Sequence, residues 1–346
     1  MKKRWLVLVT ALMLLVNATG CKDKEQETPD VSVPPVQTPE IPEQKPLRMD
    51  ALRVEIPRGD ISADRLAVAV KELPALMKEY FSDAEAVVIE EVHVTIGSSA
   101  AATAQALNEG AVDLAFLPAE AFAEYGTEAV ALLGDGAAAE QKKGTCSLLC
   151  AGPTQYGAQL TTRVGKGKSL TWKEVDHARW GVLEETSLAG YRCFDLWLAD
   201  HYAGNCVEDL TQVTMYESYE ALFRAAAAEE IDAFVIGEDA RELVADAWAL
   251  SADRTDVGGM RGFDRLKSIW EETCVLAKTE TVYTAIAAVA DRADLTDVRF
   301  SAVLEQMLSR LAEEHPEQME LLGAEQYVPI TDEELNPTRR LTTLSH

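Results

Sequence analysis

The first half of the chain alternates between two hydrophobic periods. Some segments carry apolar side chains at every second position or in short continuous runs, which is typical of strands, and others repeat them at helical spacing. The strand candidates are residues 52–56, 91–96 and 112–117, and the helix candidates are residues 62–80 and 99–108. We expect Pro74 to kink or break the first helix. Strand, helix and strand in this order predict a βαβ unit.

The same order of elements recurs in the second half. Strand candidates lie at residues 146–150, 180–183, 212–215 and 231–236, and helix candidates at 169–174, 190–202, 219–228 and from 237 to about 250. Two βαβ modules in series predict an α/β protein of two lobes, each a mainly parallel sheet flanked by helices. We expect lobe I at residues 49–150 and 283–335, lobe II at 151–282 joined by crossing hinge strands, and a C-terminal tail at 336–346.

The N-terminus departs from this pattern. Cationic residues at positions 2–4 precede an apolar run at 5–16, which is too short to span a bilayer, and the small residues of ATGC follow at 18–21. This is an export signal whose end resembles the bacterial lipoprotein lipobox, although Ala18 stands where Leu is commoner. The resemblance implies that Cys21 is lipidated and anchors the chain at the extracytoplasmic face of the cell membrane. The alternative is an ordinary secretory signal with a chance Cys.

Residues 22–48 are polar and rich in proline, and they lack aromatic residues and periodic apolar positions. Such a segment buries too little surface to offset its chain entropy. We therefore expect a disordered, semi-stiff tether between the lipid and the first lobe.

Composition narrows the classes of function. The formal net charge of −26 disfavours nucleic acid as a partner. The sequence contains no phosphate-binding loop, dinucleotide fingerprint, nucleophile elbow or zinc-protease motif, and its five histidines show no ligand-like spacing. We expect no metal and no cofactor.

Six cysteines in an exported chain raise the question of disulfides. With Cys21 assigned to lipid, five remain. Cys146 and Cys150 are too far apart along a strand to bridge each other, and Cys193 and Cys206 are too far apart along a helix. A bridge from Cys274 to Cys146 or Cys150 stays open beside the simpler interpretation of buried free thiols.

Three blocks of sequence, in order, resemble one family. They are VTIGSS at 94–99 with ALNEGAVDLAFLPA at 106–119, ETSLAGY at 185–191, and YESYEA at 216–221 with EIDAFV at 230–235. They are similar to the phosphonate- and phosphate-type substrate-binding proteins of ABC importers, and the similarity spans residues 52–335. The resemblance implies the two-lobed type 2 periplasmic-binding fold and a monomer, not an enzyme, that captures a small molecule between its lobes for an ABC permease.

The second block predicts a binding turn from its own chemistry. Thr186 and Ser187 precede a helix that begins near Gly190, so hydroxyls and unpaired helix N–H groups point the same way, as oxyanion sites require. The alternative is a simple helix cap. We expect Ser98 and Ser99 to form the corresponding turn of the other lobe. The predicted ligand-binding residues are Ser98, Ser99, Pro118, Thr186, Ser187, Gly190, Tyr191 and Tyr219.

Departures from the family pattern put a phosphate-like ligand in question. Leu188 and Ala189 stand where the family has hydroxyl residues, Tyr219 where it often has His, and Phe122 where it has an aromatic hydroxyl. A less charged organic or amphoteric solute fits as well. Two further functions stay open: an extracytoplasmic enzyme with Glu184 or Glu185 as base, and a ligand-binding sensor that feeds no transporter.

Overall fold

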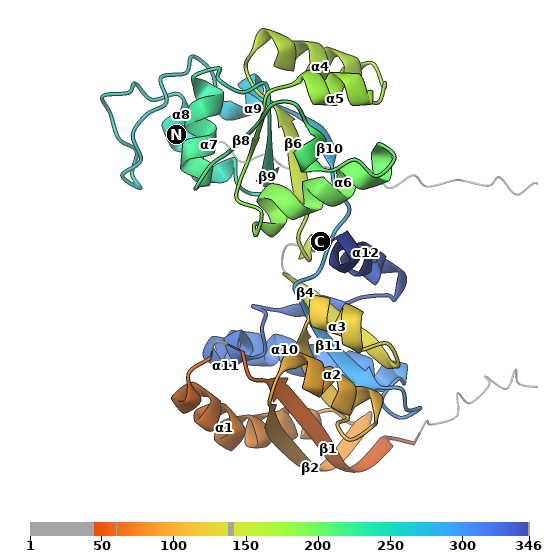
Figure 1. Cartoon of the computed structure of the whole chain (residues 1–346). Coiled ribbons are helices and arrows are strands. Elements are labelled where there is room, and N and C mark those ends of the chain that lie inside the picture. The colour runs from red at the N-terminus through yellow and green to blue at the C-terminus, as the bar shows by residue number, and fades with distance from the viewer. Residues whose placement is uncertain (1–44, 60, 138–141, 345–346) are drawn as a thin grey trace, which may run out of the picture. The chain divides into compact units, whose positions relative to one another are not determined.

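The computed structural model describes residues 45–59, 61–137 and 142–344. Their helices and strands form two α/β lobes (Figure 1). We call the seven-stranded sheet with its helices lobe I, and the five-stranded sheet with its helices lobe II. The export signal, Cys21 and nearly all of the tether lie outside the described residues, so they remain predictions.

Lobe I is built on the strand order β12-β4-β11-β3-β1-β2, with β5 paired to β4. The strands are β1 (Leu47–Pro57), β2 (Val87–Gly97), β3 (Leu114–Pro118), β4 (Ala129–Ala137), β5 (Lys142–Lys143), β11 (Ala285–Ala290) and β12 (Tyr327–Pro329). β1, β2 and β3 are mutually parallel, whereas β11, β4 and β12 run antiparallel to their neighbours. The sheet is therefore mixed rather than mainly parallel, because β11 brings the chain back from lobe II.

The helices of lobe I follow the predicted order. They are α1 (Ala63–Ser82), α2 (Ala100–Asn108), α3 (Ala119–Tyr125), α10 (Val298–Glu314) and α11 (Pro316–Leu321). Helix α1 continues through Pro74, so the expected break does not occur. Leu73 and Met77 are fully buried on either side of the proline, and their burial holds both halves on the core of lobe I.

Lobe II has the strand order β10-β6-β9-β7-β8. Its strands are β6 (Ser147–Ala151), β7 (Trp180–Val182), β8 (Val213–Met215), β9 (Ala233–Gly237) and β10 (Cys274–Lys278), and its helical segments are α4 (Gln155–Gly165), α5 (Trp172–His177), η2 (Leu188–Arg192), α6 (Cys193–His201), η3 (Val207–Asp209), α7 (Tyr219–Ala227), η4 (Glu242–Val244), α8 (Ala245–Trp248) and α9 (Ile269–Glu272). β7, β8 and β9 are parallel, and β6 and β10 are antiparallel additions. β6 thus belongs to lobe II, although we expected the boundary after residue 150.

Five cysteines lie in the described part of the chain, and all five are free thiols. A bridge between Cys150 and Cys274 is prevented by the pleat of the sheet. Val275 pairs with Cys150, so Cys274 projects to the opposite face, where it packs with Ala151 while Cys150 packs with Phe234. The interpretation of free thiols is confirmed, but Cys206 and Cys274 are only partly buried.

The two lobes repeat one stabilising arrangement, an arginine bound to the aspartate that directly precedes β3 in lobe I and β9 in lobe II. In lobe I, Arg53 donates through its backbone N (2.8 Å), Nε (2.9 Å) and Nη2 (2.6 Å) to the buried carboxylate of Asp113. In lobe II, Arg179 makes the same three bonds to Asp232, at 3.1, 2.9 and 2.8 Å. Each arginine also reaches a backbone carbonyl, at Gly110 or Glu229. The aspartates of the family-like blocks are thus structural groups in both lobes.

The C-terminal segment is a helix, although we expected a tail. Helix α12 (Asn336–Leu344) follows the short η5 turn (Glu333–Leu335) and contacts both α3 and α6. Pro337, Thr338 and Leu341 are buried.

Among the described residues, no helix is long and apolar enough to cross a membrane. The same part of the chain holds no group of three or more His, Cys, Asp or Glu side chains placed to bind a metal ion.

Candidate functional site

The turns that follow the parallel strands lie at one edge of each sheet. In lobe I these strands end at Pro57, Gly97 and Pro118, and in lobe II at Val182, Met215 and Gly237. Helices α1, α2 and α3 begin directly after the first three strands, and η2 and α7 begin after β7 and β8. In open α/β sheets this carboxyl edge is where ligands bind, because helix N-termini and loop side chains converge there.

The turn between β7 and α6 contains Thr186 and Ser187. Ser187 is the N-cap of η2, and its Oγ accepts a hydrogen bond from the Gly190 N–H at 3.1 Å. Thr186 is exposed, and its hydroxyl forms no hydrogen bond with any other described residue. The two residues, which we predicted to act together, therefore differ in role. Ser187 is a helix cap, and Thr186 has a hydroxyl available to a ligand.

Residues Leu188–Arg192 form a π-helical turn that runs straight into α6. Such widened turns recur at functional sites. A hydrogen bond from the buried Ser147 Oγ to the Ala189 carbonyl, 2.6 Å long, ties this turn to β6. Gly190 is required by close packing, since a Cβ there would lie 2.7 Å from the Leu183 side chain and from the Ser187 Oγ.

Tyr191, also predicted as a ligand contact, is buried in the core of lobe II with 7 % of its surface exposed. Burial raises the pKa of its phenol to about 12. Gly190 and Tyr191 thus shape the turn from inside, whereas Thr186 lies on its outer surface.

Tyr219 opens helix α7 and lines a cavity of about 290 Å³ at the carboxyl end of β9. Its hydroxyl accepts a hydrogen bond from the Gly237 N–H at 2.9 Å. A Cβ at Gly237 would lie 3.5 Å from the Ala189 Cβ, so the cavity wall adjoins the π-helical turn. The structure thus brings Tyr219 close to the turn that carries Thr186.

Glu238 lines the same cavity and was missed by the sequence analysis. Its carboxylate accepts from Lys278 Nζ at 2.5 Å and from the Cys146 thiol at 3.4 Å. The bond from Lys278 lowers the pKa of Glu238, and burial with the nearby Glu238 charge raises the pKa of Cys146 to about 11. Cys146 is therefore a neutral thiol at pH 7, and Glu238 is an anion already paired with a cation.

In lobe I, Ser98, Ser99 and Pro118 lie along one edge. Ser99 caps α2 by accepting from the Ala102 N–H at 3.1 Å, Ser98 is exposed, and Pro118 closes β3 at the N-terminus of α3. Arg58, which comes just after β1, is exposed and forms no ion pair within the described part. The signal for it is a cation directly after a strand end, which the sequence analysis did not single out.

We expected Ser98 and Ser99 to occupy the turn that corresponds to Thr186 and Ser187, and the strand order shows that this expectation is wrong. β1, β2 and β3 correspond to β7, β8 and β9, because the order β2-β1-β3 in one sheet repeats as β8-β7-β9 in the other. Ser99 therefore corresponds to Ser218, the cap of α7, and Ser187 corresponds to Ser62, the cap of α1. The backbone angles agree, with φ of −160° at Ser99 and −157° at Ser218.

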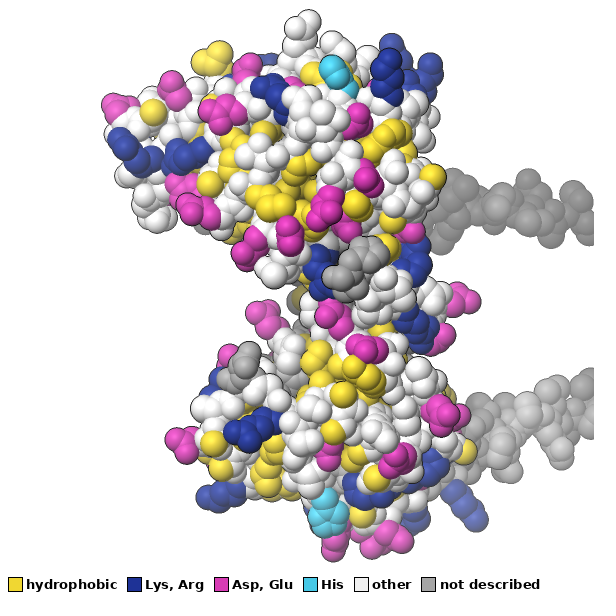
Figure 2. All heavy atoms as spheres, in the orientation of Figure 1, with side chains coloured by type: hydrophobic (Ala, Val, Ile, Leu, Met, Phe, Trp, Pro, Cys, Tyr) yellow, Lys and Arg dark blue, Asp and Glu magenta, His cyan; other side chains and the backbone are white. Residues whose placement is uncertain are grey.

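The candidate bases of the enzymatic alternative lie in the same turn. Glu184 and Glu185 are exposed, and their carboxylates form no hydrogen bond or ion pair among the described residues. Figure 2 shows acidic and basic side chains interspersed over the visible face of both lobes, without a large basic patch.

Comparisons with known proteins agree with this architecture. Residues 67–335 match the family model of the phosphonate ABC transporter periplasmic substrate-binding protein. No curated protein matches the sequence. Among solved structures, transferrin 1 from Manduca sexta is 12 % identical, with a TM-score of 0.52 over 85 % of this chain and 46 % of that one.

Two binding proteins are also among the matches. A phosphonate transporter component from Pseudomonas aeruginosa is 15 % identical over 84 % of this chain and 85 % of its own, with a TM-score of 0.35. PhnD1 from Prochlorococcus marinus, solved with methylphosphonate, is 9 % identical over 85 % and 97 %, with a TM-score of 0.37. Because the family model covers most of the sequence, the chain belongs to the family of periplasmic substrate-binding proteins of phosphonate ABC transporters.

Proposed function

We propose that this protein is the lipid-anchored solute-binding component of an importer, and that its ligand is held by the turns at the carboxyl edges of the two sheets. The observation that supports this most directly is the exposed Thr186 hydroxyl, one residue before the N-cap of the π-helical turn that follows a parallel strand. Membership of the family supports delivery to a permease. The expected lipid on Cys21 would keep the protein beside that permease.

The ligand that fits this site is a small oxyanion-bearing solute, and an amphoteric one fits better than a simple dianion. Thr186 and the first N–H groups of η2 offer donors, and Arg58 offers a cation from lobe I. Leu188 and Ala189 supply no hydroxyl, however, and the exposed Glu184 and Glu185 repel a second negative charge. Methylphosphonate, the ligand of the Prochlorococcus protein, is the natural first probe.

A transport role without catalysis fits the same residues. A general base needs a partner that orients it and a raised pKa. Glu184 and Glu185 are exposed and lack such a partner in the described residues. A monomer is the simplest form for a protein that must present both lobes to a permease.

Calorimetry on two single variants tests the binding turn. Thr186→Ala removes a donor without touching a cap, so we expect methylphosphonate affinity to fall by about 1 to 3 kcal/mol with little change in melting temperature. Ser187→Ala removes the cap to Gly190, so we expect stability to fall by about 1 kcal/mol.

Thr162→Ala is the matched control. Thr162 is an exposed threonine on α4 whose hydroxyl donates only to the Ala158 carbonyl at 2.8 Å. It should change neither affinity nor stability appreciably. Unchanged affinity in Thr186→Ala, with methylphosphonate binding the unaltered protein, would show that this turn does not hold the ligand.

A further inference from the structure

Helix α12 contacts two helices that adjoin the proposed binding site. Helix α3 begins just after Pro118 in lobe I, and α6 continues the π-helical turn that Ser187 caps in lobe II. α12 packs against both of them (Figure 1). It therefore connects the lobes in addition to the two chain segments that pass between them, one between β5 and β6 and one between β10 and β11.

The first half of α12 is fixed to lobe I. The Thr338 Oγ1 accepts from the backbone N–H of Tyr283 at 3.0 Å, and both residues are buried. Arg339 forms an ion pair with Asp332, and its Nη1 donates to the Asn336 Oδ1 at 3.2 Å. A buried hydrogen bond to a backbone amide anchors the helix more firmly than surface ion pairs do.

The second half is fixed to lobe II. Leu341 has 3 % of its surface exposed and lies in an apolar cluster with Cys193 and Leu196, against which Leu188 and Leu344 also pack. Leu188 is the first residue of the π-helical turn. The last residues of α12 thus help to cover the turn that presents Thr186.

Arg340 adds a polar connection on the same side. Its Nη1 donates to the Asp200 carboxylate near the end of α6 at 2.7 Å. Its Nη2 pairs with Glu280 in the segment between β10 and β11, which we call the crossing segment. An ion pair between Arg192, in the turn, and Glu120, at the start of α3, joins the same two helices directly.

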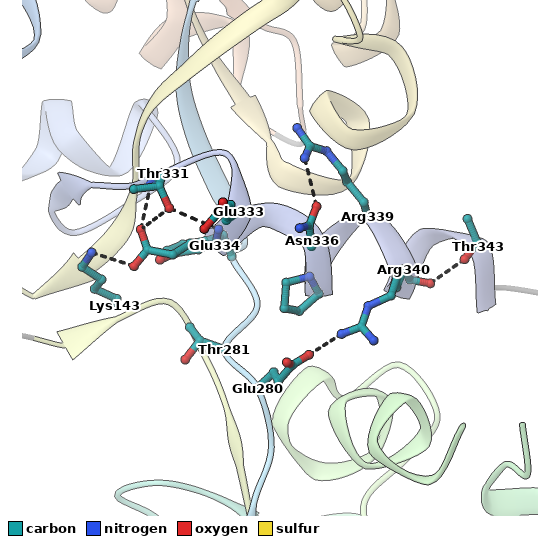
Figure 3. A pocket seen from close by; sticks show the side chains of 12 residues that line it. Lys143, Glu280, Thr281, Thr331, Glu333, Glu334, Asn336, Arg339, Arg340 and Thr343 are labelled. Carbon is teal, nitrogen blue, oxygen red and sulfur yellow. Dashed lines mark hydrogen bonds and ion pairs between the residues drawn. The ribbon is translucent and has the colours of Figure 1, made fainter. Parts of the chain in front are cut away.

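A cavity of about 920 Å³ lies between one side of α12 and the crossing segment. Its walls are residues of α12, the segment around Glu280 and Thr281, and the turn around Glu334. Figure 3 shows Arg340 reaching Glu280 across this space, and Lys143 paired with Glu334 at its other side. The cavity therefore leaves one side of α12 unpacked, while Thr338 and Leu341 hold its other side against Tyr283 and Val282 of the crossing segment. We call α12, held in this way, the strap.

We propose that α12 is a positioning element of the binding site, which holds the turn Leu188–Arg192 in place in the ligand-free protein through Leu341, Leu344 and Arg340. The inference rests on the proposed function in one respect, that this turn binds the ligand. Loosening the strap should free the turn before it unfolds either sheet, because local openings cost less than global unfolding.

Two ligand-free measurements on Leu341→Ala test the strap. Cys193 has 1 % of its surface exposed and lies in the cluster with Leu341, so its alkylation by N-ethylmaleimide, mapped by peptide mass spectrometry, reports opening of this contact. Amide hydrogen exchange in residues 187–193 reports mobility of the turn. We expect both rates to rise at least about tenfold, because the truncation removes a buried leucine from the contact. Cys150, fully buried in the core of lobe II, should stay protected.

Leu308→Ala on α10 is the matched control, since it is the same truncation at a fully buried site in lobe I. Arg340→Gln changes a partly exposed side chain and leaves the core intact, so it should raise both rates by a smaller factor of about three, and Arg340→Lys should restore much of the protection. Rates that stay unchanged in Leu341→Ala, or that rise equally in Leu308→Ala, would overturn the proposal. If methylphosphonate, other phosphonates and phosphate all failed to bind the unaltered protein, the proposed ligand class would be contradicted, and these ligand-free rates would be unaffected.

Discussion

Replacing Asp232 by Ala should destabilise lobe II without weakening ligand binding. The Asp232 carboxylate accepts four hydrogen bonds: the backbone N, Nε and Nη2 of Arg179 at 3.1, 2.9 and 2.8 Å, and the Thr154 hydroxyl at 2.7 Å. The side chain lies at the amino end of β9, and the proposed site lies at the carboxyl end. Five residues at about 3.3 Å each place the two about 16 Å apart.

The size of the loss follows from what the substitution leaves behind. The Arg179 side chain is 41 % exposed, so water replaces much of its contact with the carboxylate. The Thr154 hydroxyl is buried, and with the Arg179 N–H it loses its carboxylate acceptor. At about 1 to 3 kcal/mol for each of these two groups, we expect a loss of about 2 to 6 kcal/mol.

The effect should also depend on pH with a defined sign. Burial alone would raise the pKa of Asp232, but the hydrogen bonds from Arg179 and Thr154 outweigh it and lower the folded-state pKa. The stabilisation is therefore fully present above the unfolded pKa of about 3.9 and is lost as the pH falls below it toward the folded value. The difference between the two proteins should shrink in acid.

Urea unfolding followed by tryptophan fluorescence measures the loss, and calorimetry with methylphosphonate measures binding. Asp113→Ala is the parallel variant in lobe I, where Asp113 receives the same bonds from Arg53 and a further ion pair from Arg292 at 2.8 Å. Weakened binding by Asp232→Ala with unchanged stability would refute the structural role that we assign to this aspartate.

Three further predictions concern the anchor and two glycines. Cys21→Ser should release the protein from membranes, and a variant that stays in the membrane fraction would contradict the lipid anchor. Gly110→Ala should lower the free energy of unfolding in urea by about 1 kcal/mol, because Gly110 has φ of +67°, which strains a residue with a side chain. The cost stays this small because the added methyl group would meet no neighbour. Gly190→Ala should cost more, about 1 to 3 kcal/mol by the same assay, because its methyl group would collide with Leu183, and an equal cost at the two sites would argue against that packing.

Local patterns were enough to predict the βαβ core of each lobe. The alternation at residues 52–56 and 91–96 became β1 and β2, and the turn residues Ser99 and Ser187 became helix caps. These features depend on neighbours a few residues away, so they are readable from a single sequence.

Features set by distant contacts were missed or misplaced. The antiparallel strands β6 and β11 take their partners from the path between the lobes, which no local period encodes. Helix α12 is short and has its apolar side chains covered by α3 and α6, so its sequence did not distinguish it from a tail. The match of Ser98 and Ser99 with Thr186 and Ser187 failed because strand order, which pairs Ser99 with Ser218, is a property of the whole sheet.

Ligand capture between the two lobes is the property on which the proposed function depends. Small-angle X-ray scattering and thermal unfolding should be recorded with methylphosphonate, other phosphonates, phosphate, phosphite, nucleosides and vitamin precursors. We predict that at least one compound lowers the radius of gyration and raises stability by RT ln(1 + [L]/Kd), which is about 2.7 kcal/mol at a hundredfold excess over Kd. If every compound left both the radius of gyration and the melting temperature unchanged, solute capture by this protein would be contradicted.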